Sequence, residues 1–132
     1  MPDVTLKKKD RRPRWYNLSL FALPLPGLVS ILHRISGLLL YLAIPATLYL
    51  LEAALASPER FLHADRMVNH PLSQLAIFGV LWAIAHHWCA GVRHLLMDVH
   101  VGIDLPMARR TSRLVLISSG LLTAAFAWVI LW

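Results

Sequence analysis

The sequence predicts an all-α integral membrane protein with three transmembrane helices, and its composition and hydropathy pattern are the observations behind that prediction. Hydrophobic residues make up 58% of the 132 residues and charged residues only 15%, which is more apolar than a soluble domain of this length is able to bury. The apolar residues gather in three stretches, each reaching the roughly 20 residues that cross a hydrocarbon core. We therefore expect a single membrane domain.

Residues 1–27 are expected to form a basic N-terminal segment and an interfacial lead-in, with the three-helix membrane domain over residues 28–132. Trp15 and Tyr16 are of the aromatic types that favour a membrane interface, and two prolines argue against a continuous helix in the lead-in. The apolar run that follows is too long for a signal peptide and contains Arg34, so we interpret it as a retained span. The basic residues of the segment are Lys7, Lys8, Lys9, Arg11, Arg12 and Arg14.

We expect the spans at about 28–56, 72–98 and 112–132. Pro45 is expected to kink the first span, because its ring removes one helical hydrogen bond. The polar segment 59–70 is expected to form an amphipathic turn or two, and a loop over 99–111 is expected to join the second span to the third.

The distribution of Lys and Arg predicts the orientation. Nine of these residues lie in the N-terminal segment and around the second loop, whereas only Arg60 and Arg66 lie in the first loop. Because basic residues are retained on the cytoplasmic side, we expect a cytoplasmic N-terminus and a periplasmic C-terminus. The predicted location is a bacterial inner membrane, crossed several times.

This orientation predicts that polar side chains of the first two spans converge near the inner face, where the first span begins and the second ends. A charged side chain at the bilayer centre costs roughly 2.5–3.5 kcal/mol on insertion scales, so such side chains usually face a partner, a cavity or a ligand. Either arginine alone could instead extend to the headgroups, but that does not account for the others. The predicted cluster is Ser30, His33, Arg34, Arg93, His94 and Asp98.

His87 is expected to lie deeper, about 16 Å from Asp98 along the helix. His87, Gly91, His94 and Asp98 share one helix face. Gly91 is expected to leave a flat space that admits a planar macrocycle, with His87 ligating its iron and His94 near its anionic edge. The alternative is that His87 hydrogen-bonds a neighbouring helix and Gly91 marks a close helix crossing. His86 points about 100° away and competes as the ligand.

A six-coordinate b-type haem needs a second axial ligand at the depth of His87. The third span contains no His, Met or Cys, and His33 is expected too near the inner face. The spacing therefore predicts that a second protein supplies that ligand.

At these residues the chain resembles a known family, the cytochrome b membrane-anchor subunit of succinate dehydrogenase. The similarity extends over nearly the whole chain, and the two longer motifs are its specific part. The matching segments are Arg12-Pro13 with Asn17-Leu18-Ser19-Leu20, then Ser30-Ile31-Leu32-His33-Arg34-Ile35-Ser36-Gly37, and finally His87-x-x-x-Gly91-x-Arg93-His94-x-x-x-Asp98.

The resemblance implies an anchor subunit of respiratory complex II, whose dicarboxylate chemistry is carried by another subunit. Electrons would pass from succinate through a flavoprotein subunit and an iron–sulfur subunit to ubiquinone. It also implies a second small three-helix anchor subunit, so that this chain is half of a heterodimeric helical bundle sharing one haem b. By the same resemblance Ser30 and Arg34 bind the quinone and His87 is an axial haem ligand. His33, Arg34, Gly91 and His94 would lie near the haem.

Other functions stay open at this point. The chain could anchor a quinol:fumarate reductase, because similar anchors serve the reverse reaction, or it could be a haem-free structural anchor. A proton or ion carrier using Asp98 and the histidines is a third class. That class predicts a continuous polar path, which the outer halves of the spans lack.

Overall fold

The computed structural model describes residues 23–131, which form four helices and no strand. The basic segment and most of the predicted lead-in lie outside the described residues. The helices are α1 (Leu25–Ala56), α2 (Pro58–Val68), α3 (Pro71–Asp98) and α4 (Leu105–Leu131).

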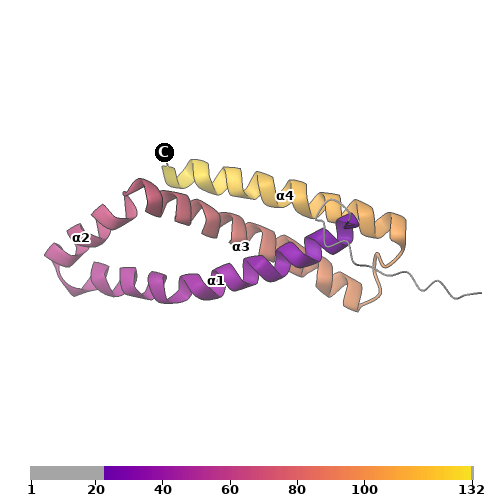
Figure 1. Ribbon diagram of the computed structural model, residues 1–132, viewed down its shortest axis with the longest axis horizontal. Coiled ribbons are helices and arrows are strands. Elements are labelled where there is room, and N and C mark those ends of the chain that lie inside the picture. Colours follow the sequence, from indigo (N-terminus) through magenta and orange to yellow (C-terminus); the bar gives the residue numbers. More distant parts are fainter. Residues whose placement is uncertain (1–22, 132) are drawn as a thin grey trace, which may run out of the picture.

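Three of these helices are long and apolar enough to cross a membrane, namely Leu25–Ala56, Pro71–Asp98 and Leu105–Ile130. This confirms the predicted all-helical membrane fold. Figure 1 shows α3 lying between α1 and α4, with the short α2 joining α1 to α3 at the end where α4 finishes. The start of α1, the end of α3 and the start of α4 therefore meet at the opposite end.

The packing is what a membrane bundle requires, with small side chains between the helices and large apolar ones outside. Val29, Ala83, Ala90 and Val115 are buried, whereas leucines throughout the spans are exposed; Leu121, for example, is 68% exposed. Lipid is as apolar as leucine, so helix association depends on close approach through small residues.

The first helix begins at Leu25, three residues before the expected span, and continues through Pro45. Pro24 precedes it in an extended conformation, and Pro26 falls in the first turn, where the missing N–H of proline has no helical partner to lose. Figure 1 shows that α1 is not straight.

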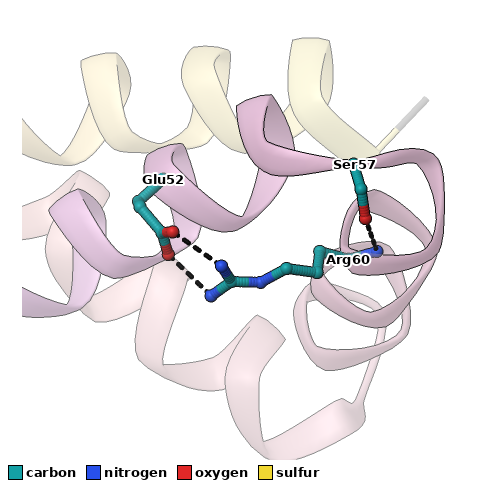
Figure 2. Close-up of polar contacts among 3 residues, drawn as sticks. All are labelled: Glu52, Ser57 and Arg60. Carbon is teal, nitrogen blue, oxygen red and sulfur yellow. Dashed lines mark hydrogen bonds and ion pairs between the residues drawn. The ribbon is translucent and has the colours of Figure 1, made fainter.

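A helix of 11 residues, α2, replaces the one or two turns expected after the first span. The Ser57 hydroxyl caps it by accepting from the Arg60 backbone N–H at 3.3 Å. The Arg60 guanidinium donates to both oxygens of Glu52, each at 2.7 Å, so the corner between α1 and α2 is tied (Figure 2). The backbone N–H of Glu59 and the Ser57 hydroxyl lower the pKa of Glu59, an exposed residue at this helix start.

The expected loop over 99–111 is too long, because α4 begins at Leu105. His100 and Gly102 both adopt positive φ, 63° and 77°, which lets the chain reverse within a few residues. Pro106 is compatible with the first helical turn, and the Asp104 carbonyl accepts from the Ala108 N–H at 2.7 Å. Arg109 and Arg110, which fall within the range expected for the loop, therefore lie in α4.

Candidate functional site

The contact between α1 and α3 brings two predicted site histidines face to face. The rings of His33 on α1 and His87 on α3 stack with their centroids 4.2 Å apart and their planes 16° from parallel. His94, two turns along α3 from His87, lies with its ring centroid 5.0 Å from that of His33. Three half-buried imidazoles thus form one continuous group.

The hydrogen bonds of His87 fix which of its ring nitrogens carries the proton. Nδ1 lies 3.2 Å from the His33 carbonyl oxygen and 3.2 Å from the Ser36 hydroxyl. The carbonyl is only able to accept, and the Ser36 hydroxyl already donates to that same carbonyl at 2.8 Å. Both contacts therefore require an Nδ1–H donor, which leaves the lone pair of the neutral ring on Nε2.

Gly37 is a residue of this site that the sequence pattern did not single out. A methyl group at its Cα would come within 3.0 Å of His87 Cε1, so the absence of a side chain on α1 is what seats the His87 ring against the helix. Ser36 was missed as well. The sequence could have indicated Ser36, because it follows His33 by one helical turn within the same α1 motif.

The expected empty space beside Gly91 is occupied. His33 Nε2 lies 3.7 Å from the position a Gly91 side-chain carbon would take, so the glycine admits an imidazole of α1. The expectation that His33 lies too near the inner face to reach the depth of His87 is also wrong, because the His33 ring contacts the rings of both His87 and His94. Helix α1 crosses α3 here at a depth that spacing within one helix does not reveal.

The predicted inner-face cluster is only partly assembled. Ser30 is half-buried and Arg34 exposed on α1, one turn apart. Arg93 faces the other way: its Nε donates to Thr111 Oγ1 on α4 at 3.2 Å, and the residue is 6% exposed. Asp98 is exposed at the last position of α3. The convergence expected for Arg93 is wrong, because its position on α3 is rotated about 120° from that of His87.

His86 is enclosed on a different face of α3, about 100° around the helix from His87, where it lies against both α4 and Val29 of α1. It has no exposed surface, stacks on Trp82 with ring centroids 5.3 Å apart, and its Nδ1 lies 3.4 Å from Ser119 Oγ on α4. Among residues 23–131, its Nε2 is the buried side-chain nitrogen without a hydrogen-bond partner. A ligand would reach it only if α4 repacked, so His86 is the weaker candidate for binding iron.

Comparison with known proteins identifies the family of this chain. Residues 8–126 match the family model for the succinate dehydrogenase/fumarate reductase transmembrane subunit. The chain is 34% identical over 119 residues to the succinate dehydrogenase cytochrome b556 subunit of Paracoccus denitrificans, covering 90% of this chain and 89% of that protein.

Two further relatives extend the match. The corresponding subunit of Coxiella burnetii is 36% identical over 121 residues, covering 90% of this chain and 97% of that protein. The mitochondrial cytochrome b560 subunit of Sus scrofa is 27% identical over 122 residues, covering 89% and 71% respectively. These matches show that this chain belongs to the family of succinate dehydrogenase/fumarate reductase transmembrane cytochrome b subunits.

Proposed function

We propose that this chain binds one haem b through His87 and forms part of a ubiquinone-reduction site in succinate dehydrogenase. The observation that carries the haem proposal is the protonation of His87. A metal-ligating histidine typically donates its other ring N–H to a backbone carbonyl or a similar acceptor. His87 makes that bond to the His33 carbonyl, and its Nε2 keeps a lone pair for the iron.

The donor set fits a haem shared between two proteins. The stacked His33 ring presents its π face to His87, so the two rings would not both hold one iron in this arrangement. His33 is therefore not the second ligand in this arrangement, and α4 carries no histidine. A histidine from a second small three-helix anchor subunit is the proposed partner ligand. His33, Arg34, Gly91 and His94 are proposed to lie along the haem edge.

Haem b supplies one-electron redox chemistry when bound, and the chain's own residues determine how that chemistry meets the quinone. Ser30 and Arg34 occupy one face of α1, a single turn apart. The hydroxyl of Ser30 is a donor for a quinone carbonyl, and the Arg34 guanidinium stabilises negative charge that develops on the quinone oxygen. Arg34 forms no ion pair within residues 23–131, which is consistent with a cation available to a bound substrate.

The other subunits of the proposed complex carry the succinate chemistry. A flavoprotein subunit oxidises succinate, an iron–sulfur subunit carries the electrons, and this chain anchors both to a bacterial inner membrane. The chain would have its N-terminus in the cytoplasm and its C-terminus in the periplasm. The end of the bundle where α1 starts and α3 ends would then face the iron–sulfur subunit.

The haem proposal is tested by reduced-minus-oxidised difference spectra of the complex assembled with its partner anchor. His87→Ala should remove most of the b-type absorbance, whereas His86→Ala should retain it. The opposite ranking would assign the iron to His86. A wild-type complex without b-type bands would leave only a structural anchor.

The quinone proposal is tested separately with Ser30→Ala and Arg34→Ala. Each should slow succinate:ubiquinone reduction by about 10-fold or more, because each removes a hydrogen bond to a group that is charged or becomes charged during the reaction. Succinate oxidation by an artificial dye that accepts electrons from the hydrophilic subunits should be unchanged. Equal losses in both assays would mean that these variants disturb assembly and would refute the assigned role.

A further inference from the structure

Arg93 is a buried cation without a counter-charge in the part of the chain that the structure describes. It is 6% exposed, and its one hydrogen bond runs from Nε to Thr111 Oγ1 at 3.2 Å. Thr111 is itself engaged with the carbonyls of Met107 and Ala108, at 3.1 and 3.2 Å. A guanidinium carries five N–H donors, so most of those of Arg93 have no acceptor within residues 23–131.

The terminal nitrogens of Arg93 are not enclosed by the described bundle, and the residue lines an open groove. A guanidinium stays protonated in proteins, so an anion in that groove would meet a cation that has no counter-charge within residues 23–131. The Thr111 hydroxyl offers only a dipole. Close to the charge, the contact between α3 and α4 is apolar, with Ala90 and Val115 buried together.

A groove of about 360 Å³ lies beside Arg93 between α3 and α4. Its α3 wall includes Trp88, Val92 and Leu96, and its α4 wall includes Leu114 and Ser118. Most of this lining is apolar, and Arg93, Thr111 and Ser118 are its polar side chains. The groove therefore offers a cation joined to a long apolar channel, which matches an amphiphile better than a simple ion.

The charge around the groove favours an anionic occupant. Arg109, Arg110 and Arg113 are exposed in the first turns of α4, and Arg110 is placed about 40° from the groove-lining Leu114 around the helix. Basic pockets between transmembrane helices on the cytoplasmic side are suited to anionic lipid headgroups.

We infer that this groove binds an anionic glycerophospholipid. Its phosphate would accept hydrogen bonds from the free N–H groups of Arg93, with Arg110 close by, and one acyl chain would lie along Trp88, Val92 and Leu114. The groove lies between α3 and α4, whereas the His33–His87–His94 group lies between α1 and α3. The lipid site is therefore separate from the proposed haem and quinone sites, and its assignment does not rest on them.

The test uses the intact complex, purified in detergent and depleted of lipid. Phosphatidylglycerol, phosphatidylcholine and inorganic phosphate are added in turn. Lipid retention is measured by native mass spectrometry and the thermal midpoint by the loss of folded complex. Phosphatidylglycerol should be retained and raise the midpoint, phosphatidylcholine should do so less, and phosphate should have no effect.

Arg93→Gln should weaken phosphatidylglycerol retention by about 10-fold or more, in line with the loss of a hydrogen-bonded charge. Arg66→Gln, an equal loss of charge on α2 at the far end of the bundle, should not. If Arg93→Gln does not assemble, Ser118→Phe fills the groove without touching the charge and should also lower retention.

Three results would overturn the inference. One is equal retention of both lipids by the wild-type complex. Another is stabilisation by phosphate alone, which would indicate an ion site. The third is undiminished phosphatidylglycerol retention in the assembled Arg93→Gln or Ser118→Phe complex, which would mean that a different group, such as a carboxylate of another subunit, faces Arg93.

Discussion

The two faces of α3 carry neighbouring histidines in opposite situations. On the α1 face, His87 is half-buried, and its Nδ1 is held by a carbonyl and a serine, which leaves the lone pair on a ring nitrogen that is not fully enclosed. On the α4 face, His86 is completely buried and its unpartnered Nε2 has no access to solvent or lipid within the described bundle. A residue's chemistry here depends on which ring nitrogen the packing leaves open.

The same division applies to the charges and the glycines. The α1 face has Gly37 and Gly91 where imidazoles approach the backbone, whereas the α4 face has alanines and serines in close contact and a buried cation, Arg93. We therefore expect variants on the α1 face to change haem properties and variants on the α4 face to change stability or lipid binding.

Apart from the loss of His87 itself, the largest effect is expected from Gly37→Ala. The added methyl group would approach His87 Cε1 to 3.0 Å, and the ring is held on its other sides by His33 and Ser36, so it has little room to move. Haem occupancy, measured by pyridine haemochrome per assembled complex, should fall severalfold. Changing a group that positions a metal ligand typically lowers metal affinity by a comparable or larger factor.

Gly79→Ala is the matched control for this prediction. Gly79 lies in the same membrane bundle, on α3, and a methyl group added there would meet no neighbouring helix within 4 Å in the described part of the chain. The change should be neutral or stabilising, because alanine is favoured over glycine in a helix by about 1 kcal/mol. Normal haem occupancy in Gly37→Ala would show that the His87 ring is not seated by this glycine.

The next effect is expected from His86→Ala, and it should appear in stability. The variant leaves a cavity beside Trp82 and removes the contact with Ser119, which together should cost about 1–3 kcal/mol. The thermal midpoint of the complex should fall while the haem spectrum per assembled complex is retained. A stable complex with an altered haem spectrum would reverse the division between the two faces.

Sequence pattern predicted the spans and the stripe of His87, Gly91 and His94, because hydropathy and the 3.6-residue period act within one helix. It did not predict which helix each face meets. His33 against Gly91, and Arg93 against Thr111, depend on how α1 and α4 are rotated and shifted against α3. Those rotations and shifts depend on how buried residues such as Val29 and Ala90 pack against one another. The spacing of residues within one helix does not reveal that packing.

The early start of α4 has a similar cause. Pro106 and Gly102 fall within the range expected for the loop, yet proline is compatible with a first helical turn and the turn needs only the positive φ values of His100 and Gly102. Proline and glycine thus indicated that a helix boundary lies in this segment, but they did not determine the residue at which α4 begins.

The smallest effects come from a matched pair of serines, Ser36→Ala and Ser119→Ala, which compare the two faces most directly. Both hydroxyls are buried and contact a histidine of α3, at 3.2 Å for His87 and 3.4 Å for His86. Each contact is expected to contribute about 0.6 kcal/mol, the average for a hydrogen bond between membrane helices. Their thermal midpoints should therefore be nearly equal.

The haem is where the two serine variants should differ. In Ser36→Ala, His87 Nδ1 keeps the His33 carbonyl but loses a second acceptor, so the basicity of the ring changes and the haem midpoint potential should shift measurably. In Ser119→Ala, the potential should stay at the wild-type value, because the Ser119 hydroxyl contacts His86 and not the proposed ligand His87. Redox titration of both complexes at the same pH gives the comparison. Equal shifts in the two variants would mean that the potential responds to packing of the whole bundle and not to the hydrogen bonds of His87.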